Sequence, residues 1–356
     1  MATIVMAGGG TGGHVIPLLA VAGELRSRGH QPVFIGTRTG FEAKLVPPAG
    51  FPLEFIEIGG LKRVGVIRTA RTMVQLPVGV GKVLGMLRRY QPRAIFSMGG
   101  YAAGPVVLAG LLRRLPLVVM EPNAMPGLTN RQVGRFVTRA LLSFPEASSF
   151  FPPGRSEITG LPVRSEFFAI TPKPREAKLT VLITGGSQGS RRLNEAALGS
   201  WRYFREANFP VRFIHQTGTE AHEALARKFA ESGLEGEVLP FIDNMPAAFA
   251  KADLVICRAG AGTVTELAAA GKPSVLVPLP NAADQHQLRN AEALVKSGAA
   301  QLVLDKDMDG GRLFEEVGKL SSRPEVLRRM GEQARTFAHP TAARRAAEVV
   351  EELIRD

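Results

Sequence analysis

The sequence predicts an α/β fold built from two Rossmann-like domains, each with a doubly wound parallel sheet. Its 356 residues suffice for two domains that each bury a core. A glycine-rich loop follows an apolar, strand-like run twice, at residues 8–13 and 185–190. Short apolar runs alternate with helical stretches along the whole chain, which is typical of parallel sheets. We expect two domains that face each other across a cleft, with ligands beyond the carboxyl ends of the strands.

The first half of the chain predicts a strand over residues 3–7, and the glycine loop then leads into a helix over residues 14–28. Pro17 fits the first turn of that helix, and Gly29 fits the position just after its end. The pattern predicts further strands at residues 32–35, 94–98 and 116–120.

The second half repeats this rhythm, with helical stretches between short apolar runs. Its strands are expected at residues 179–184, 211–216, 237–240, 254–257, 274–278 and 300–304. We expect the domain boundary near residues 159–163, so that the domains cover residues 1–161 and 162–339. The last segment, residues 340–356, has a helical pattern and is expected to pack back on the first domain.

The composition is that of a globular protein, with 45% hydrophobic and 21% charged residues. Cys257 is the only cysteine, which excludes an intramolecular disulfide and fits a reducing compartment. The first apolar run has no basic leader, and no stretch of about 20 apolar residues is free of charge. We therefore expect neither a secretory signal nor a transmembrane helix.

The net charge of +12 is concentrated in the first half of the chain. Residues 1–160 contain 18 Lys and Arg and seven Glu but no Asp, hence +11. A one-sided charge of this kind indicates an anionic partner.

The densest basic stretch, residues 62–93, interleaves Lys and Arg with aliphatic residues. Tyr90 is its only aromatic residue, which favours an anionic membrane surface over nucleic acid. The alternative is that the aliphatic residues belong to the core and the cations to a solvated face. Four helix-breaking residues argue against one regular helix here, namely Pro77, Gly79, Gly81 and Gly85.

The first glycine loop formally matches the dinucleotide pattern G-x-G-x-x-G. The second strand, however, runs into Gly36-Thr37-Arg38 without the carboxylate that would hold a ribose, so no nicotinamide cofactor is expected. Six small residues in succession favour close approach of a ligand over a simple tight turn. His14 follows the loop at the helix start, where it is either a capping residue or a general base.

Residues 253–266 form the most specific stretch of the chain, a strand followed by a small-residue loop and a helix that begins near residues 262–263. The start of that helix would face a diphosphate. Glu266 in its first turn would accept both hydroxyls of a ribose, or else cap the helix. Gln287 and Asn290 offer side-chain amides that suit sugar hydroxyls, and the alternative is a polar loop with a helix start.

Acidic residues at 305–309, with Glu316 further on, formally match a calcium-binding EF-hand loop. A strand-like run precedes them where an EF-hand requires a helix. We therefore interpret them as acids gathered at the start of a helix, and no metal site is expected.

Taken together, these residues resemble the MurG family of bacterial peptidoglycan N-acetylglucosaminyltransferases. The resemblance covers nearly the whole chain. It rests on residues 9–14, 99–101, 121–123, 127–130, 162–164, 185–189, 258–266, 286–287 and Asn290. Pro122 departs from the family, in which many members have Gln.

The resemblance implies a GT-B fold and an inverting transferase that is peripheral on the cytoplasmic face of the bacterial plasma membrane. It implies UDP-N-acetylglucosamine as donor and lipid I, the undecaprenyl-diphosphate-linked MurNAc-pentapeptide, as acceptor. The product would be lipid II for cell-wall biogenesis. Residues 1–161 would form the acceptor and membrane-associating domain, and residues 162–339 the donor domain.

The family resemblance also assigns site residues. Glu266 would bind the ribose and Ile242 the uracil through its backbone, while Gln287 and Asn290 would contact the sugar. The remaining donor residues would be Thr11, Gly12, Gly13, Asn123, Arg164, Ser187, Ala261, Gly262, Thr263, Val264 and Thr265. Tyr101 and Asn130 are assigned to the acceptor.

We expect His14 to be the general base, with Glu121 as its rival. Helix N-termini and Arg164 would stabilise the departing diphosphate, so no metal or cofactor is required for the chemistry. A divalent cation assisting the acceptor diphosphate stays open. The alternatives are a UDP-N-acetylglucosamine 2-epimerase, which needs no acceptor, and a non-catalytic nucleotide sensor, which needs no base.

Overall fold

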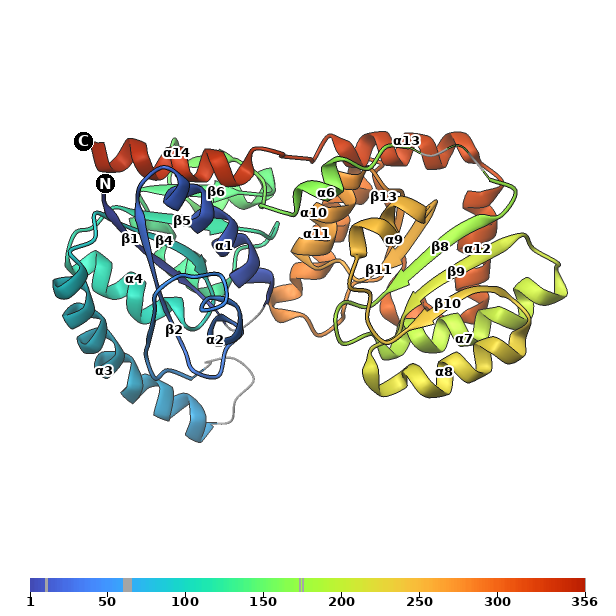
Figure 1. Cartoon of the computed structure of the whole chain (residues 1–356), viewed down its shortest axis with the longest axis horizontal. Coiled ribbons are helices and arrows are strands. Elements are labelled where there is room, and N and C mark those ends of the chain that lie inside the picture. Colours follow the sequence, from blue (N-terminus) through green and yellow to red (C-terminus); the bar gives the residue numbers. More distant parts are fainter. Residues whose placement is uncertain (10–11, 60–65, 173, 175, 356) are drawn as a thin grey trace. The chain divides into compact units, whose positions relative to one another are not determined.

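The computed structural model describes residues 1–9, 12–59, 66–172, 174 and 176–355. It divides into two compact units, Met1–Pro162 with Thr341–Asp356, and Val163–Pro340 (Figure 1). The boundary between Pro162 and Val163 falls one residue after the domain boundary expected between residues 161 and 162. In the described part of the chain, no helix is long and apolar enough to cross a membrane.

The first unit contains a seven-stranded, entirely parallel sheet in the order β3-β2-β1-β4-β5-β6-β7. Its strands are β1 (Thr3–Gly8), β2 (Gln31–Gly36), β3 (Leu53–Phe55), β4 (Ala94–Gly99), β5 (Leu117–Glu121), β6 (Arg139–Leu142) and β7 (Ser156–Ile158). The chain leaves β1 to one side for β2 and returns to its other side as β4. The loops after β1 and β4 therefore lie at the switch point, where doubly wound sheets bind ligands.

Helices cover this sheet. They are α1 (Gly12–Ser27), α2 (Glu42–Leu45), α3 (Val66–Tyr90), α4 (Ala103–Leu112), α5 (Leu128–Val133) and α14 (Ala342–Arg355), with 3-10 turns at Gly134–Phe136 and Pro145–Phe150. The last helix, α14, packs against α1, which is the placement expected for residues 340–356. Arg345 makes a bidentate ion pair with Glu157, with N–O distances of 2.6 and 2.9 Å.

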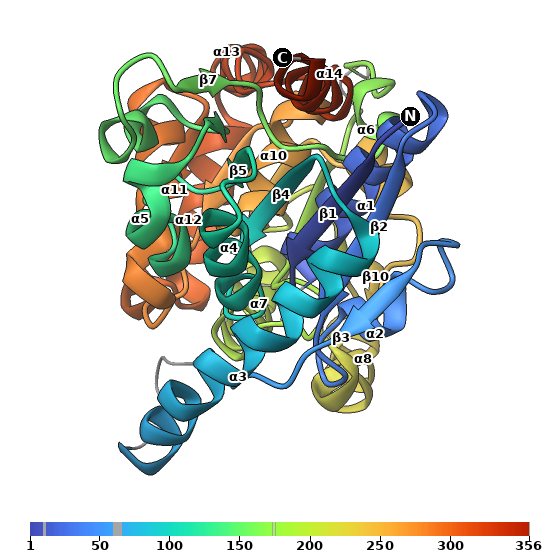
Figure 2. The ribbon, with the colours of Figure 1, turned by 90° about the vertical axis from the view of Figure 1, so that its left-hand side faces the viewer.

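Residues 62–93 were predicted not to form one regular helix, and this prediction was wrong. Helix α3 runs without a break from Val66 to Tyr90 with Pro77 inside it. Lys62 and Arg63 lie outside the described residues. The helix buries Val83 and Leu87 and lies beside α4 (Figure 2). Gly79 lies at this helix contact, where a Cβ would be in ordinary van der Waals contact with the Pro105 ring, 3.4 Å away. This packing outweighs the low helix propensity of the segment.

The second unit contains a six-stranded parallel sheet in the order β10-β9-β8-β11-β12-β13. Its strands are β8 (Leu179–Thr184), β9 (Val211–Gln216), β10 (Glu235–Leu239), β11 (Leu254–Cys257), β12 (Ser274–Leu276) and β13 (Ala300–Leu302). This sheet has a switch point as well, because the chain leaves β8 to one side for β9 and returns to its other side as β11. The second glycine loop and the loop after β11 therefore meet at one edge of the sheet.

The helices of the second unit are α6 (Ser165–Phe168), α7 (Arg191–Glu206), α8 (Thr219–Ser232), α9 (Met245–Lys251), α10 (Ala261–Ala270), α11 (His286–Lys296), α12 (Gly310–Ser321) and α13 (Pro324–Arg335), with 3-10 turns at Ala283–Gln285 and Asp305–Asp307. Its core holds an aromatic cluster. Phe204 packs edge-to-face on Phe213 and Phe314, with ring centroids 5.2 and 4.9 Å apart. This core fixes the sheet whose carboxyl edge carries the candidate donor residues.

Candidate active site

Four residues of the first unit were expected to line the donor site. Thr11 lies outside the described residues. Gly12 and Gly13 open helix α1, so their backbone N–H groups belong to its free N-terminus. Asn123 is half-buried after β5, and its side chain donates to Glu121.

His14 is the third residue of α1 and its ring is half-buried. Its Nδ1 atom lies 3.3 Å from the carbonyl oxygen of Gly9. The loop after β4 packs against the same two groups. A Cβ at Gly100 would lie 2.9 Å from the Gly9 carbonyl oxygen and 3.3 Å from His14 Nδ1. If Nδ1 carries the proton, the other ring nitrogen, Nε2, is left as the basic atom. The arrangement therefore suits a general base.

Glu121, the rival base, is almost completely buried at the end of β5. Its Oε1 accepts hydrogen bonds from the backbone N–H and the side chain of Asn123, at 2.9 and 3.0 Å. Its Oε2 accepts from the Gly127 N–H at 3.0 Å and from the Asn130 side chain at 2.9 Å. With four donors on one carboxylate, the geometry favours a structural role, in which Glu121 holds the loop between β5 and α5.

Asn130 was expected to contact the acceptor, but only 2% of its surface is exposed. Its side chain is directed at Glu121 and at the Met120 carbonyl, so it positions the loop rather than presenting a free amide. Tyr101, the other acceptor residue, is half-buried and has its hydroxyl 3.5 Å from Thr37 Oγ1. Of these two residues, Tyr101 has the more accessible side chain.

The second glycine loop follows β8 and packs against the backbone after β9. Gly189 and Gly218 have φ values of +75° and +80°, and a Cβ at either would collide with backbone atoms of the facing segment. Ser187 lies exposed on this loop, as a phosphate contact requires. Only glycine fits at both positions, because no neighbouring side chain could move aside.

Gln216, which the sequence analysis did not identify, ties three segments together at this edge. Its Nε2 donates to the Gly186 carbonyl at 2.7 Å, and its Oε1 accepts from the Ile242 N–H at 2.9 Å. The Ile242 N–H is therefore already bonded. A backbone contact from Ile242 to a uracil would use its carbonyl group.

His215 and Asn194 form a second support that the sequence analysis missed. His215 Nε2 lies 3.0 Å from Asn194 Oδ1, and Asn194 donates to the Thr217 carbonyl at 2.9 Å. Burial lowers the pKa of His215 to about 4, so the ring is neutral at neutral pH. No local sequence pattern signals this pair, because the two residues lie on different elements.

The loop after β11 is held by the two residues expected to contact the sugar. Gln287 Oε1 accepts from the N–H groups of Ala259 and Leu279, at 3.2 and 3.0 Å. Asn290 is fully buried and donates to the Ala259 carbonyl at 3.2 Å. Asn290 is thus a loop support, whereas Gln287 is half-buried and keeps its Nε2 group without a partner among the described residues.

Glu266 was expected in the first turn of its helix, and that was wrong. Helix α10 begins at Ala261, after Gly260 as N-cap, so Glu266 lies in the second turn and does not cap the helix. Burial raises the pKa of Glu266 to about 7, and the positive charge of Arg164 opposes that rise. The five residues before Glu266, Ala261, Gly262, Thr263, Val264 and Thr265, form the N-terminal part of α10.

The acidic residues at 305–309 belong to the fold. Asp305 accepts from Arg258 at 2.5 Å, and Arg258 also donates to the Val277 carbonyl at 3.0 Å. Asp309 caps α12 by accepting from the Arg312 N–H at 2.8 Å, as acids at a helix start were predicted to do. Among the described residues, no group of three His, Cys, Asp or Glu is placed to hold a metal ion.

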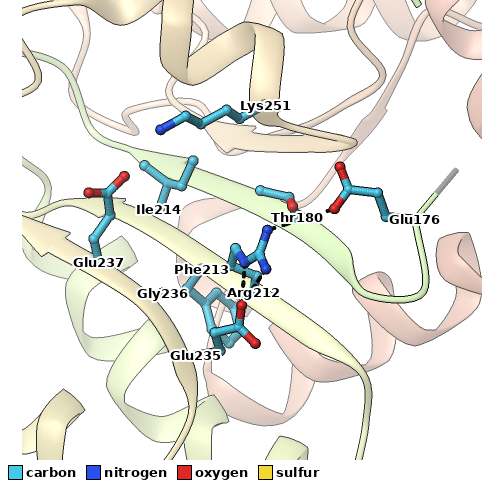
Figure 3. A pocket seen from close by; sticks show the side chains of 9 residues that line it. All are labelled: Glu176, Thr180, Arg212, Phe213, Ile214, Glu235, Gly236, Glu237 and Lys251. Atoms are coloured by element: carbon cyan, nitrogen blue, oxygen red, sulfur yellow. Dashed lines mark hydrogen bonds and ion pairs between the residues drawn. The ribbon is translucent and has the colours of Figure 1, made fainter. Parts of the chain in front are cut away.

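A pocket of about 400 Å³ opens at the opposite, amino-terminal edge of the second sheet. Figure 3 shows Arg212 between Glu176 and Glu235, with Glu237 and Lys251 further out. Arg212 pairs with both neighbouring carboxylates. Because it lies at the opposite edge of the sheet, this ion-paired surface is distinct from the candidate site. Charged residues on the edge strand β10 disfavour pairing with another strand.

Two doubly wound sheets, each with a glycine loop and helix N-termini at its switch point, form the architecture of the GT-B class of glycosyltransferases, which other enzymes share. The model of the glycosyltransferase family 28 N-terminal domain matches residues 4–142, and that of the C-terminal domain matches residues 180–347. The chain is therefore a glycosyltransferase.

Proteins that match this chain over nearly its whole length identify its family among the glycosyltransferases. The UDP-N-acetylglucosamine–N-acetylmuramyl-(pentapeptide) pyrophosphoryl-undecaprenol N-acetylglucosamine transferase of Solibacter usitatus is 59% identical, over 99% of this chain and 97% of its own. The crystal structure of Acinetobacter baumannii MurG matches with a TM-score of 0.86 and 33% identity, covering 99% of this chain and 100% of that one. The chain belongs to the MurG family.

The UDP-GlcNAc 2-epimerase of Neisseria meningitidis matches with a TM-score of 0.67 but only 13% identity, covering 99% of each chain. That likeness shows the shared fold alone and does not favour the epimerase alternative.

Proposed function

We propose that the protein transfers N-acetylglucosamine from UDP-N-acetylglucosamine to the C4 hydroxyl of the MurNAc unit of lipid I, giving lipid II. The observation that carries this proposal is the 59% identity, over nearly the whole chain, to a transferase named for that reaction. The site geometry supports it, since each sheet has its glycine loop and a helix N-terminus at the switch point.

The second unit is proposed to bind the donor. Glu266 would accept the ribose hydroxyls, and the start of α10 with Arg164 and Ser187 would surround the diphosphate. Arg164 is exposed and near enough to Glu266 to act on its charge. Gln287 would donate from Nε2 to the sugar, while Asn290 and Gln216 hold the loops at the carboxyl edge of the second sheet.

The first unit is proposed to supply the base. His14 Nε2 would take the proton from the acceptor hydroxyl as that oxygen attacks C1 of the donor sugar. The C1–O bond to UDP breaks on the opposite side, so the anomeric configuration inverts. The departing diphosphate carries away the electron pair and is stabilised by backbone N–H groups and Arg164, without a required metal. A divalent cation would assist only at the acceptor diphosphate.

The membrane contact is proposed to lie on α3 and α4, which are neighbours in the first unit. Apolar side chains stand exposed there, Val78 by 60% and Leu112 by 68%. Exposed cations accompany them at Lys82, Arg88, Arg113 and Arg114. Aliphatic residues among cations suit an anionic lipid surface, so we place the enzyme peripherally on the cytoplasmic face of the plasma membrane.

The test of the reaction is incubation with labelled UDP-N-acetylglucosamine, with and without a lipid I analogue. Label should enter the lipid fraction only when the analogue is present. Conversion of the donor without an acceptor would support the epimerase instead. Donor binding without turnover in either arm would support a nucleotide sensor.

A further inference from the structure

A pocket of about 550 Å³ opens in the first unit, and the sequence analysis did not identify it. It lies at helix α5 and the neighbouring 3-10 turns, and its lining residues are Leu128, Arg131, Gln132, Arg135 and Phe150. Two of these side chains carry a positive charge and none carries a negative one. Two others are apolar. The pocket therefore suits a ligand in which an anionic group is joined to a hydrocarbon.

The two arginines act from the same side of the chain. Arg131 and Arg135 are four positions apart, and helix α5 continues directly into the turn Gly134–Phe136, so this spacing brings both side chains to one face. The Arg135 guanidinium lies 4.6 Å from the centre of the Phe136 ring, and within the described ranges it has no carboxylate partner. Its charge is therefore available to a ligand.

A pair of guanidinium groups matches a diphosphate well. Each planar guanidinium binds a phosphate through two parallel hydrogen bonds, and a diphosphate offers two phosphates side by side. A single carboxylate would leave one of the two cations without a partner. The charge and the number of donors in the pocket thus favour a diphosphate over a lone carboxyl group.

Hydrogen bonds connect α5 to the acceptor side of the candidate site. The Gly127 N–H, directly before α5, donates to Glu121 Oε2 at 3.0 Å. The Thr129 hydroxyl donates at 3.0 Å to the carbonyl of Gly100, the residue before Tyr101. Helix α5 also packs against α4, which belongs to the proposed membrane surface (Figure 2). The pocket thus lies on a helix that contacts both the acceptor residues and the surface proposed to meet the lipid.

The parts of the proposed acceptor follow the same order, because its diphosphate joins the sugar to the undecaprenyl chain. We propose that Arg131 and Arg135 bind the diphosphate of the lipid-linked acceptor, with Leu128 and Phe150 against the adjoining part of its hydrocarbon chain. This inference rests on the proposed function, in which that acceptor is the substrate. The two arginines hold the acceptor and take no part in the proton transfer.

The test compares Arg131→Gln/Arg135→Gln with the native enzyme on a water-soluble lipid I analogue with a short hydrocarbon chain, without membranes. The KM for the analogue should rise at least about tenfold, because hydrogen bonds to charged groups are lost. The kcat and the Kd for UDP-N-acetylglucosamine should stay within about twofold, since the arginines touch neither the reacting atoms nor the donor. An unchanged KM for the analogue would overturn the inference.

A second analogue, with an uncharged linker in place of the diphosphate, identifies the group that is bound. The native enzyme and the double variant should bind it with the same calorimetric Kd. A loss of affinity as large as that for the diphosphate analogue would mean that the arginines contact another part of the acceptor, and the inference would be wrong. Arg131→Lys/Arg135→Lys keeps both charges without the parallel hydrogen bonds and should recover part of the affinity.

The matched control is Arg26→Gln/Arg93→Gln, which removes two exposed arginines of the first unit and changes the net charge equally. It should leave the KM for the soluble analogue in place. Vesicle sedimentation separates the acceptor from bulk phospholipid. If Arg131→Gln/Arg135→Gln binds anionic vesicles more weakly but binds the soluble analogue like the native enzyme, the pocket takes phospholipid headgroups and the inference is overturned.

Calorimetric binding of the diphosphate analogue without donor separates this inference from the proposed function, because it requires no transfer. If the native protein labels lipid I but this binding does not depend on the two arginines, only the inference fails. If the binding depends on the arginines but label never enters the lipid fraction, the proposed transfer fails and the diphosphate site stands.

Discussion

The imidazole Nδ1 atom of His14 and the carbonyl oxygen of Gly9 lie 3.3 Å apart, which directs the other ring nitrogen away from the loop backbone. His14→Ala should therefore lower kcat by about 100- to 10,000-fold, the usual contribution of a positioned base. Calorimetric UDP binding should stay nearly unchanged. His222→Ala is a matched control, because His222 bonds a backbone carbonyl of the second unit at 3.2 Å. Native turnover in His14→Ala would refute the assignment.

Glu121→Gln tests whether the rival acid supports the loop or takes the proton. An amide replaces one carboxylate oxygen by an NH2 group that would face two of the four donors, so we expect a loss of about 1–3 kcal/mol in unfolding free energy, measured by urea denaturation. Activity should fall, but the limbs of the pH–rate profile should keep their positions. Disappearance of the acidic limb would instead make Glu121 the base. The exposed Glu146→Gln serves as control.

If Glu266 binds the ribose as proposed, its raised pKa predicts that donor binding depends on pH. Its pKa of about 7 means that the acid is half protonated at neutral pH, whereas ribose hydroxyls bind the ionised form best. Affinity for UDP-N-acetylglucosamine should rise about tenfold from pH 6 to pH 8, measured by calorimetry. The sugar nucleotide is preferable to UDP, whose terminal phosphate itself titrates in this range. Glu266→Gln should bind more weakly and show a flat profile, and a native profile in that variant would contradict the ribose assignment.

His215 makes stability depend on pH. Its folded pKa of about 4 lies below the ordinary value of 6.5, so its contribution is fully present above pH 6.5 and is lost as the pH falls to about 4. The loss should reach about 3 kcal/mol, since one pKa unit corresponds to about 1.4 kcal/mol. Urea unfolding of His215→Gln should show a correspondingly flatter dependence between pH 6.5 and 4. Parallel curves for the two proteins would show that the ring is not held neutral.

Charge reversal tests the membrane surface. The variant Arg88→Glu/Arg113→Glu/Arg114→Glu should bind vesicles containing anionic lipids more weakly in a sedimentation assay, because each cation near the lipid is worth about 1 kcal/mol. Exposed residues of the second unit supply a control with the same change in net charge, Arg205→Glu/Arg227→Glu/Lys228→Glu. Equal losses in both variants would indicate a nonspecific effect of charge. Unchanged binding in the first would reject the α3–α4 surface.

The sheets and most helices could be predicted from sequence because apolar runs and glycine loops are local signals. Predictions failed where long-range packing decides. The Pro77 region forms one helix because α3 lies along α4, and α10 begins earlier than expected, which moves Glu266 out of the first turn. The buried support His215 could not be predicted, because its partner Asn194 comes from another element.

Long-range packing also decides the roles of two asparagine side chains, which the sequence alone does not reveal. Asn290 was interpreted as a ligand contact because side-chain amides bind hydroxyl groups, and Asn130 was assigned to the acceptor by the family resemblance. In the fold each amide is buried against backbone or carboxylate oxygens of its own unit. A polar residue near a glycine loop can support the loop as readily as contact a ligand, and only its burial separates the two roles.

Helix α14 completes the first unit although it follows the whole of the second unit in the chain. During synthesis, the ribosome therefore releases Val163–Pro340 before the first sheet receives the helix that covers its α1 side. The contacts of α14 with α1 and β4 therefore form last, and the first unit cannot complete its packing until the end of the chain has left the ribosome.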